Sequence, residues 1–159
     1  MRRGVVSLLA LLMAGVAAGG ASAGDWRVLK RIPVPGDGGW DYLIVDDAAR
    51  RLYVTHNAQV DVLDADTGKV MGKVAKTAGV HGVALAPDLG RGFASNGRAN
   101  TVTIFDTKTL RPLGDVATGK NPDAIIYDPA TRRVFAFNGG GASATVIDAA
   151  TGKVAGTLE

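Results

Sequence analysis

The stretch from Asn121 to Glu159 reads NPDAIIYDPATRRVFAFNGGGASATVIDAATGKVAGTLE. Two earlier stretches of the chain follow the same plan. In each of the three, an alternating apolar run closes on an aspartate, at Asp64, Asp106 and Asp148, so this marker aspartate recurs every 42 residues. Repeats of this length, built from short apolar runs without a long helical stretch, indicate the blades of a β-propeller.

Each repeat contains four apolar runs, which we interpret as four strands. The first runs do not alternate, as expected for an innermost strand buried on both faces, whereas the third runs alternate. The marker aspartate is expected to accept hydrogen bonds from the turn after it. Gly68 and Gly152 stand where that turn needs a positive φ. Leu110 takes this place in the middle repeat, so its turn must differ or carry strain.

These runs predict an all-β fold, a β-propeller of four-stranded antiparallel blades. The blades span residues 40–79, 80–120 and 121–159. Residues 26–34 match the fourth run of the first repeat and predict an orphan outer strand. Three blades are fewer than the usual four to eight, which predicts an incomplete ring. We therefore expect either the N-terminal part of a longer chain or a protomer that associates through its open blade faces.

The first 23 residues read as a secretory signal peptide. Arg2 and Arg3 form the basic region, Val5 to Ala18 the apolar core, and Ala21-Ser-Ala23 the cleavage site. Residues 24–159 would then be the mature partial propeller, periplasmic or extracellular and without a membrane span. The alternative is an uncleaved anchor, but the apolar core is short for a membrane span of about 20 residues.

Net charge points to no class of partner, whereas the cysteine content excludes two kinds of site. Without Arg2 and Arg3, 16 basic residues face 15 acidic ones, counted from the 18 and 15 of the whole chain. This near-neutral balance gives no reason to infer a nucleic-acid partner. The chain has no cysteine, so disulfides and thiolate metal sites are excluded.

Several segments resemble one family of propellers. Tyr53 to Asn57 reads YVTHN, which closely resembles the motif that names the YVTN β-propeller repeat family, also called YncE-like. The segments that begin at Asp64 (DADTGKV) and Asp148 (DAATGKV) look like its D-x-x-T-G-K-V element, and Ala86-Pro-Asp88 is similar to its S-P-D turn. The resemblance spans residues 27–159. It implies a secreted or periplasmic propeller, typically of seven blades, but no single activity.

Strand polarity places two sets of loops at one end of the blades, near the axis. The loop-entry set, at the start of each first strand, is Asp41, His81 and Asp123. The hairpin set, between second and third strands, is His56, Asn96 and Asn138. Trp40 and Arg98 lie beside them. Convergent polar groups on a concave face are the default binding hypothesis, so these eight residues form the candidate axial face.

Each of these residues also has a structural alternative. The loop-entry set occupies equivalent repeat positions and would then anchor the loop before the innermost strand. The residues of the hairpin set also occupy equivalent positions in the three repeats, and asparagine suits tight turns. Trp40 can cap the core as well as stack on a ligand, and Arg98 can be a solvated loop charge.

No metal, cofactor or catalytic set is predicted. His56 and His81 are too few for a zinc site. The segment Asp64 to Gly68 lacks the third acidic position and the distal glutamate of a calcium loop. The glycines after Asn138 open no helix, so they form no phosphate loop. Ser95 lies near the candidate face without a visible base and orienting group.

The sequence thus predicts a binding or interaction scaffold for an unidentified protein or small-molecule ligand, and a fragment of a longer propeller. The alternative is a propeller enzyme or redox-associated subunit, lactonase-like or dehydrogenase-associated, with its site on the axial face. That alternative rests on analogy of fold, and fold does not determine function. A truncated product without a function of its own is a third interpretation.

Overall fold

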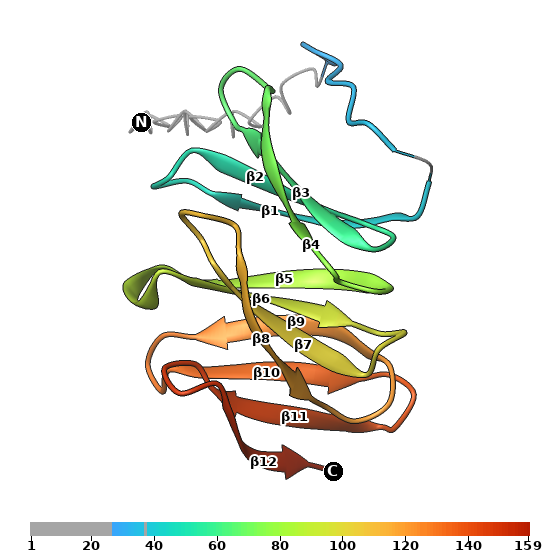
Figure 1. The fold of residues 1–159 in the computed structure, drawn as a ribbon, viewed down its shortest axis with the longest axis vertical. Coiled ribbons are helices and arrows are strands. Elements are labelled where there is room, and N and C mark those ends of the chain that lie inside the picture. Colours follow the sequence, from blue (N-terminus) through green and yellow to red (C-terminus); the bar gives the residue numbers. More distant parts are fainter. Residues whose placement is uncertain (1–26, 37) are drawn as a thin grey trace, which may run out of the picture. The chain divides into compact units, whose positions relative to one another are not determined.

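The computed structural model describes residues 27–36 and 38–159. Its strands form three four-stranded sheets, which we call blades 1, 2 and 3 (Figure 1). Blade 1 contains β1 (Trp40–Asp46), β2 (Arg51–His56), β3 (Gln59–Asp64) and β4 (Val70–Ala75). Blade 2 contains β5 (Val80–Ala86), β6 (Arg91–Asn96), β7 (Thr101–Asp106) and β8 (Pro112–Ala117), with the 3-10 helix η1 (Pro87–Leu89) after β5. Blade 3 contains β9 (Pro122–Asp128), β10 (Arg133–Asn138), β11 (Ser143–Asp148) and β12 (Lys153–Leu158).

Within each blade the strands pair in chain order and antiparallel, which confirms the predicted fold class. The blades pack side by side through two apolar cores. Tyr53, Val62 and Val74 of blade 1 meet Val83 and Phe105 of blade 2. The second core joins blade 2 to blade 3, with Phe93, Ile104, Val134 and Ile147 among its members. Burial between blades is therefore what holds neighbouring repeats together.

The innermost strands are not all buried on both faces, contrary to the sequence expectation. Strand β5 lies between two blades and is buried or half-buried throughout. Strands β1 and β9 each have a blade on one side only, and most of their residues are exposed or half-exposed. The non-alternating sequence of these strands therefore suits a strand that is packed between two blades. Of the three described innermost strands, β5 has this position.

The marker aspartates close their turns as predicted. Asp64 Oδ1 accepts hydrogen bonds from the backbone N–H of Thr67 at 2.7 Å and from its hydroxyl at 2.8 Å. Asp106 and Asp148 make the same pair of bonds to the threonine three residues later. These bonds favour the ionised carboxylate, so they lower the pKa of all three aspartates.

The turn at Leu110 has the same conformation as the glycine turns. Its φ is 61°, against 75° at Gly68 and 69° at Gly152. In all three turns the N–H at this position donates to the marker aspartate's carbonyl oxygen at 2.8 Å. Leu110 therefore carries left-handed strain that glycine avoids. Its side chain packs on Gly72 of blade 1, so burial partly offsets that strain.

Two predictions concern the N-terminal part of the chain, an orphan outer strand and a signal peptide. Residues 27–35 have no helix or strand, so the orphan outer strand stays a prediction. Ile32, within this predicted strand, has its side chain over Gly68 of blade 1, where it would contact an added Cβ. The predicted signal peptide, residues 1–23, lies outside the described residues. Within the described ranges, no helix has the length and apolarity needed to cross a membrane.

Candidate functional site

Two members of the loop-entry set meet across the boundary between blades 1 and 2. Asp41 stands near the start of β1 and His81 near the start of β5, and His81 Nδ1 lies 2.6 Å from Asp41 Oδ2. Both side chains are partly exposed. This contact is the interblade anchor of the structural alternative, and the Nε2 side of the imidazole faces Gly97.

A glycine makes room for that second side of His81. At Gly97, an added Cβ would lie 2.6 Å from His81 Nε2 and 2.4 Å from Asn121 Oδ1. Two polar atoms of neighbouring blades therefore converge over Gly97, and a side chain at this position would clash with them. Asn121 itself is held by its backbone N–H, which donates to Asn100 Oδ1 at 2.8 Å.

Beside these residues a small pocket of about 110 Å³ opens between the innermost strands of all three blades. Its lining residues are Tyr42, Gly82, Val83, Asp123, Ala124, Ile125 and Ile126. Tyr42 and Gly82 directly follow Asp41 and His81 in the chain, so the pocket adjoins the Asp41–His81 contact. Asp123, the third member of the loop-entry set, is exposed and is the acidic residue among those that line the pocket.

Ser95 of β6 holds two strands of the pocket wall together by hydrogen bonds. The Ser95 hydroxyl accepts from the N–H of Gly82 at 3.0 Å and donates to the carbonyl of Asp123 at 2.5 Å. It thus ties β9 of blade 3 to β5 of blade 2. An added Cβ at Gly82 would lie 3.1 Å from Ile125, which is why β5 and β9 can approach closely here. Ser95 is buried, and its bonds to the backbone give it a positioning role.

The hairpin set is buried inside the blades and does not line the face. Asn96 Nδ2 donates to the hydroxyl of Thr103 at 2.8 Å, and Asn138 Nδ2 donates to the hydroxyl of Thr145 at 3.1 Å. His56 makes the equivalent contact, with Nδ1 3.3 Å from Asp61 Oδ2. Each residue joins the end of its second strand to the third strand of the same blade. These are the contacts that the structural alternative requires of buried polar groups. The Oδ1 atoms of Asn96 and Asn138 are buried without a hydrogen-bond partner among the described residues.

Trp40 and Arg98 are both at the surface of the candidate face. Trp40 stacks on the His56 ring, with ring centroids 3.9 Å apart and 16° between the planes. It therefore caps a buried imidazole while remaining half-exposed. Arg98 is exposed in the turn after β6, where its backbone and Cβ lie against Gly79.

Among residues 27–36 and 38–159, no group of three or more histidine, cysteine, aspartate or glutamate side chains could hold a metal ion. His56 and His81 belong to separate clusters, each paired with its own aspartate.

Sequence reasoning missed the residues that make the pocket. Tyr42, Gly82 and Ile125 line the pocket, but the sequence analysis does not single them out. Nor does it single out Asn121, which lies with His81 over Gly97. The signal was present for Tyr42 and Gly82, since each directly follows a loop-entry residue on an innermost strand. Asn121 and Ile125 could not be found this way, because their role depends on the close approach of β5 and β9.

Comparison with known proteins extends the description of the fold. No protein-family model and no curated protein sequence matches the chain. Among solved structures, it is similar to hydrazine synthase of Kuenenia stuttgartiensis, with a TM-score of 0.72 and 18% identity over 83% of this chain and 39% of that one. It is also similar to U3-55K and to the RRP9 WD40 repeats, each with a TM-score of 0.69 and 13% identity, over 80% of this chain and 41% of the other.

These similarities define the class of protein. The chain is a β-propeller protein whose described part is an unclosed set of three blades. It spans about two fifths of the length of the chains that it matches. At identities of 13–18%, these similarities show a shared fold and nothing about function.

Proposed function

We propose that the chain is a secreted or periplasmic β-propeller binding scaffold, part of a longer propeller, that receives one cationic side chain of a partner protein in its axial pocket. The observation that carries the proposal is the pocket of about 110 Å³, whose lining residues are one acidic residue, Asp123, and otherwise apolar or aromatic ones. Sites for drug-sized molecules are about 300–1,000 Å³, so this pocket suits a single side chain.

The chemistry of the wall favours a lysine-like group. Val83, Ala124 and Ile125 offer apolar contact to an aliphatic stem. Lysine side chains commonly bury their methylene stems along such apolar surfaces. Asp123 is exposed at the wall and offers its carboxylate to the ammonium group. The ring of Tyr42, itself exposed, adds an aromatic face on which a cation is attracted.

Secretion and family membership are part of the same proposal. They rest on the N-terminal sequence, with Arg2, Arg3 and the Ala21-Ser-Ala23 site, and on the YVTHN and D-x-x-T-G-K-V segments. Expression of the whole chain in a Gram-negative bacterium should yield periplasmic protein that begins at Gly24, as determined by intact mass. Cytoplasmic protein that retains Met1 would contradict this part.

The binding proposal is tested with a matched pair of probes. N-acetyl-lysine methylamide should shift the amide resonances of Gly82 and Ile125 in NMR spectra, whereas the norleucine analogue, which lacks the ammonium group, should shift them far less. The Asp123→Asn variant should lose the difference between the probes. Asp47→Asn is the control, because it removes the same charge from the turn after β1, at a residue that does not line the pocket. Equal shifts with both probes would refute the cationic pocket.

A further inference from the structure

Another hollow lies at the opposite end of the innermost strands from the axial pocket. The axial pocket lies near the start of β5 and β9, whereas this hollow of about 580 Å³ lies where the two strands end. Its volume falls within the range of about 300–1,000 Å³ that is usual for small-molecule sites. Blades 2 and 3 build it together, and its lining residues are Leu85, Pro87, Asp88, Tyr127, Pro129 and Arg132.

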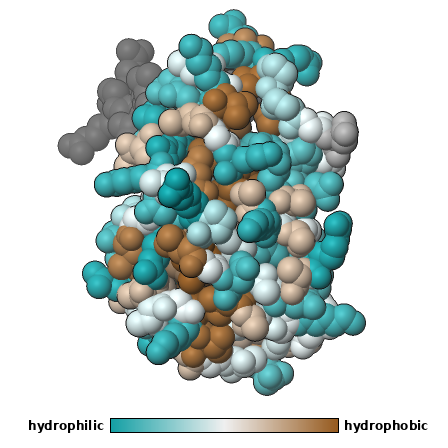
Figure 2. All heavy atoms as spheres, viewed as in Figure 1, coloured by the Kyte–Doolittle hydropathy of each residue, from teal (hydrophilic) through white to brown (hydrophobic). Residues whose placement is uncertain are grey.

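The apolar part of the wall consists of two pairs of equivalent residues. Leu85 and Tyr127 occupy the same position in β5 and β9 and are half-buried. Two residues after them follow Pro87 and Pro129, which are both exposed. In Figure 1 the turn with η1 and the turn between β9 and β10 lie at the left edge, where Figure 2 shows apolar and hydrophilic side chains side by side. The wall thus offers apolar surface, three rings among it, to the ring of a ligand.

The polar part of the wall is a chain of contacts that crosses from blade 3 to blade 2. The Tyr127 hydroxyl donates to Asp88 Oδ1 at 2.8 Å, and Arg132 Nε lies 3.2 Å from Asp88 Oδ2. Both oxygens of this carboxylate therefore have a partner. The two Nη groups of Arg132 make no hydrogen bond or ion pair with the part of the chain that the structure describes, and the side chain is 63% exposed. The donors left unmatched in the hollow are thus guanidinium N–H groups.

This polar set departs from the repeat. The equivalent place between blades 1 and 2 has none of the three side chains and carries instead Ala48, Leu85 and Gly90. Blades 1 and 2 nevertheless pack through a continuous apolar core. The packing of neighbouring blades therefore does not require these polar residues, and an exposed ion pair such as that of Arg132 and Asp88 adds little stability.

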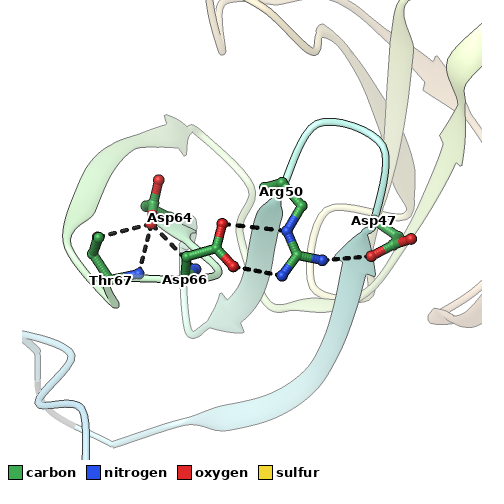
Figure 3. A network of polar contacts seen from close by, with 5 residues as sticks. All are labelled: Asp47, Arg50, Asp64, Asp66 and Thr67. Carbon is green, nitrogen blue, oxygen red and sulfur yellow. Dashed lines mark hydrogen bonds and ion pairs between the residues drawn. The ribbon is translucent and has the colours of Figure 1, made fainter.

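The equivalent arginine of blade 1 has a structural role that Arg132 lacks. Arg50 binds the carboxylates of Asp47 and Asp66 in its own blade (Figure 3). The equivalent positions of blade 3 carry no carboxylate, since they are Pro129 and Ala150. Arg132 is therefore not held by its own turn, and its guanidinium reaches the carboxylate of the neighbouring blade instead.

The backbone at Arg132 is one that glycine would adopt more easily. Its φ is 54°, and the equivalent residue of blade 2, Gly90, has a φ of 62°. A left-handed conformation costs free energy for an arginine, whereas glycine avoids that cost. The contacts of Arg132 within the protein offset this cost less than the two ion pairs of Arg50 do. A ligand for the guanidinium accounts for an arginine at this position.

From these observations we propose that the hollow binds a small aromatic carboxylate, with its ring against Tyr127 and the two prolines and its carboxylate on the Nη groups of Arg132. The planar guanidinium presents paired N–H groups that match the two oxygens of a carboxylate. Tyr127 supplies a ring against which an aromatic ligand can stack in an offset or edge-to-face arrangement. Asp88 is a positioning residue, because it holds Nε of Arg132 and leaves the Nη groups to the ligand.

The probe for this site is phenylacetate, titrated into the chain while the amide resonances of Asp88 and Arg132 are followed by NMR. A ligand of this size should bind with a dissociation constant of about 1 mM. Phenylacetamide lacks the charge and should bind at least about tenfold more weakly, since it loses the charge-assisted hydrogen bonds. Cyclohexylacetate lacks the aromatic ring and should bind about threefold more weakly.

Two variants install the residues that blade 2 has at the equivalent positions, so both should keep the fold. Arg132→Gly should weaken phenylacetate binding at least about tenfold and leave phenylacetamide binding unchanged. Tyr127→Leu should remove the preference for phenylacetate over cyclohexylacetate. Arg50→Gly is the control, because it makes the same change at the equivalent position of blade 1, outside the hollow, and should leave binding unchanged.

Three results would overturn the proposal. They are equal affinity for phenylacetate and phenylacetamide, unchanged phenylacetate binding in the Arg132→Gly variant, and no resonance shift at Asp88 and Arg132 up to about 10 mM phenylacetate. The outcome does not depend on the axial pocket, because lysine-like probes are followed there at Gly82 and Ile125, and phenylacetate here at residues of the other end of the blades.

Discussion

Blades 2 and 3 have nearly the same strand plan but very different surroundings. Both place an aromatic residue in the middle of the second strand, an aliphatic pair on the third and an aspartate turn after it. Phe93 of blade 2 is fully buried because blade 3 covers it, whereas its equivalent Phe135 is half-buried. The difference shows that each blade carries apolar residues on both of its faces, and that their burial depends on how many neighbouring blades are present.

The largest expected effect separates these two aromatic residues. Phe93→Ala should cost about 3–5 kcal/mol of the free energy of unfolding, as for a fully buried phenylalanine. Phe135→Ala should cost less than half as much, because water already reaches its ring. Denaturant unfolding, followed by circular dichroism in dilute protein, measures both. Equal losses would mean that blade 3 is covered as blade 2 is.

A second test adds one methyl group inside blade 2. An added Cβ at Gly92 would lie 2.1 Å from the Phe105 ring, so Gly92→Ala should destabilise the chain by about 1–3 kcal/mol through overpacking. Gly114→Ala, in the outer strand of the same blade, meets no atom within 4 Å and serves as the control. Thermal unfolding of both variants checks this; an unchanged midpoint for Gly92→Ala would contradict the packing between β6 and β7.

The arginines that begin the second strands of blades 2 and 3 give a smaller and more direct comparison. Arg91→Ala removes hydrogen bonds from a guanidinium to two carbonyls of blade 3 and should cost about 1–3 kcal/mol. Arg133→Ala removes a partly exposed ion pair and should cost less than about 1 kcal/mol in dilute protein. If both losses were alike, the hydrogen bonds of Arg91 to blade 3 would not be the source of its effect.

The smallest expected effect is on acid stability. The pKa of each marker aspartate is lower in the folded chain than its ordinary value of 3.8, because the turn N–H and threonine hydroxyl bind the carboxylate. Their contribution is therefore present above that value and lost as the pH falls through the folded pKa values. Replacing Asp64, Asp106 and Asp148 by asparagine keeps the acceptor oxygen but does not titrate. The variant should show a shallower loss of stability below about pH 4, and an unchanged slope would assign the acid sensitivity elsewhere.

Much of the fold could be predicted from the sequence because each repeat is a local unit. The 42-residue spacing, the alternating third strands and the aspartate turns all depend on residues close together in the chain. The candidate site was less predictable. The loop-entry residues Asp41 and His81 do meet, but His56, Asn96 and Asn138 proved to be buried hairpin residues, because polar side chains at strand ends can turn inward to the next strand as readily as outward.

The sequence by itself determined the blade architecture, the number of repeats and the aspartate turns, since these follow from residue order and short-range hydrogen bonding. Only the tertiary structure decided which strands are buried, which loop residues reach the axial pocket and where Arg133 finds its acceptor. Those properties depend on contacts between residues that are dozens of positions apart, such as Ser95 with Asp123 and Arg91 with Ala150. No local pattern records such contacts, because they form only when one blade packs against the next.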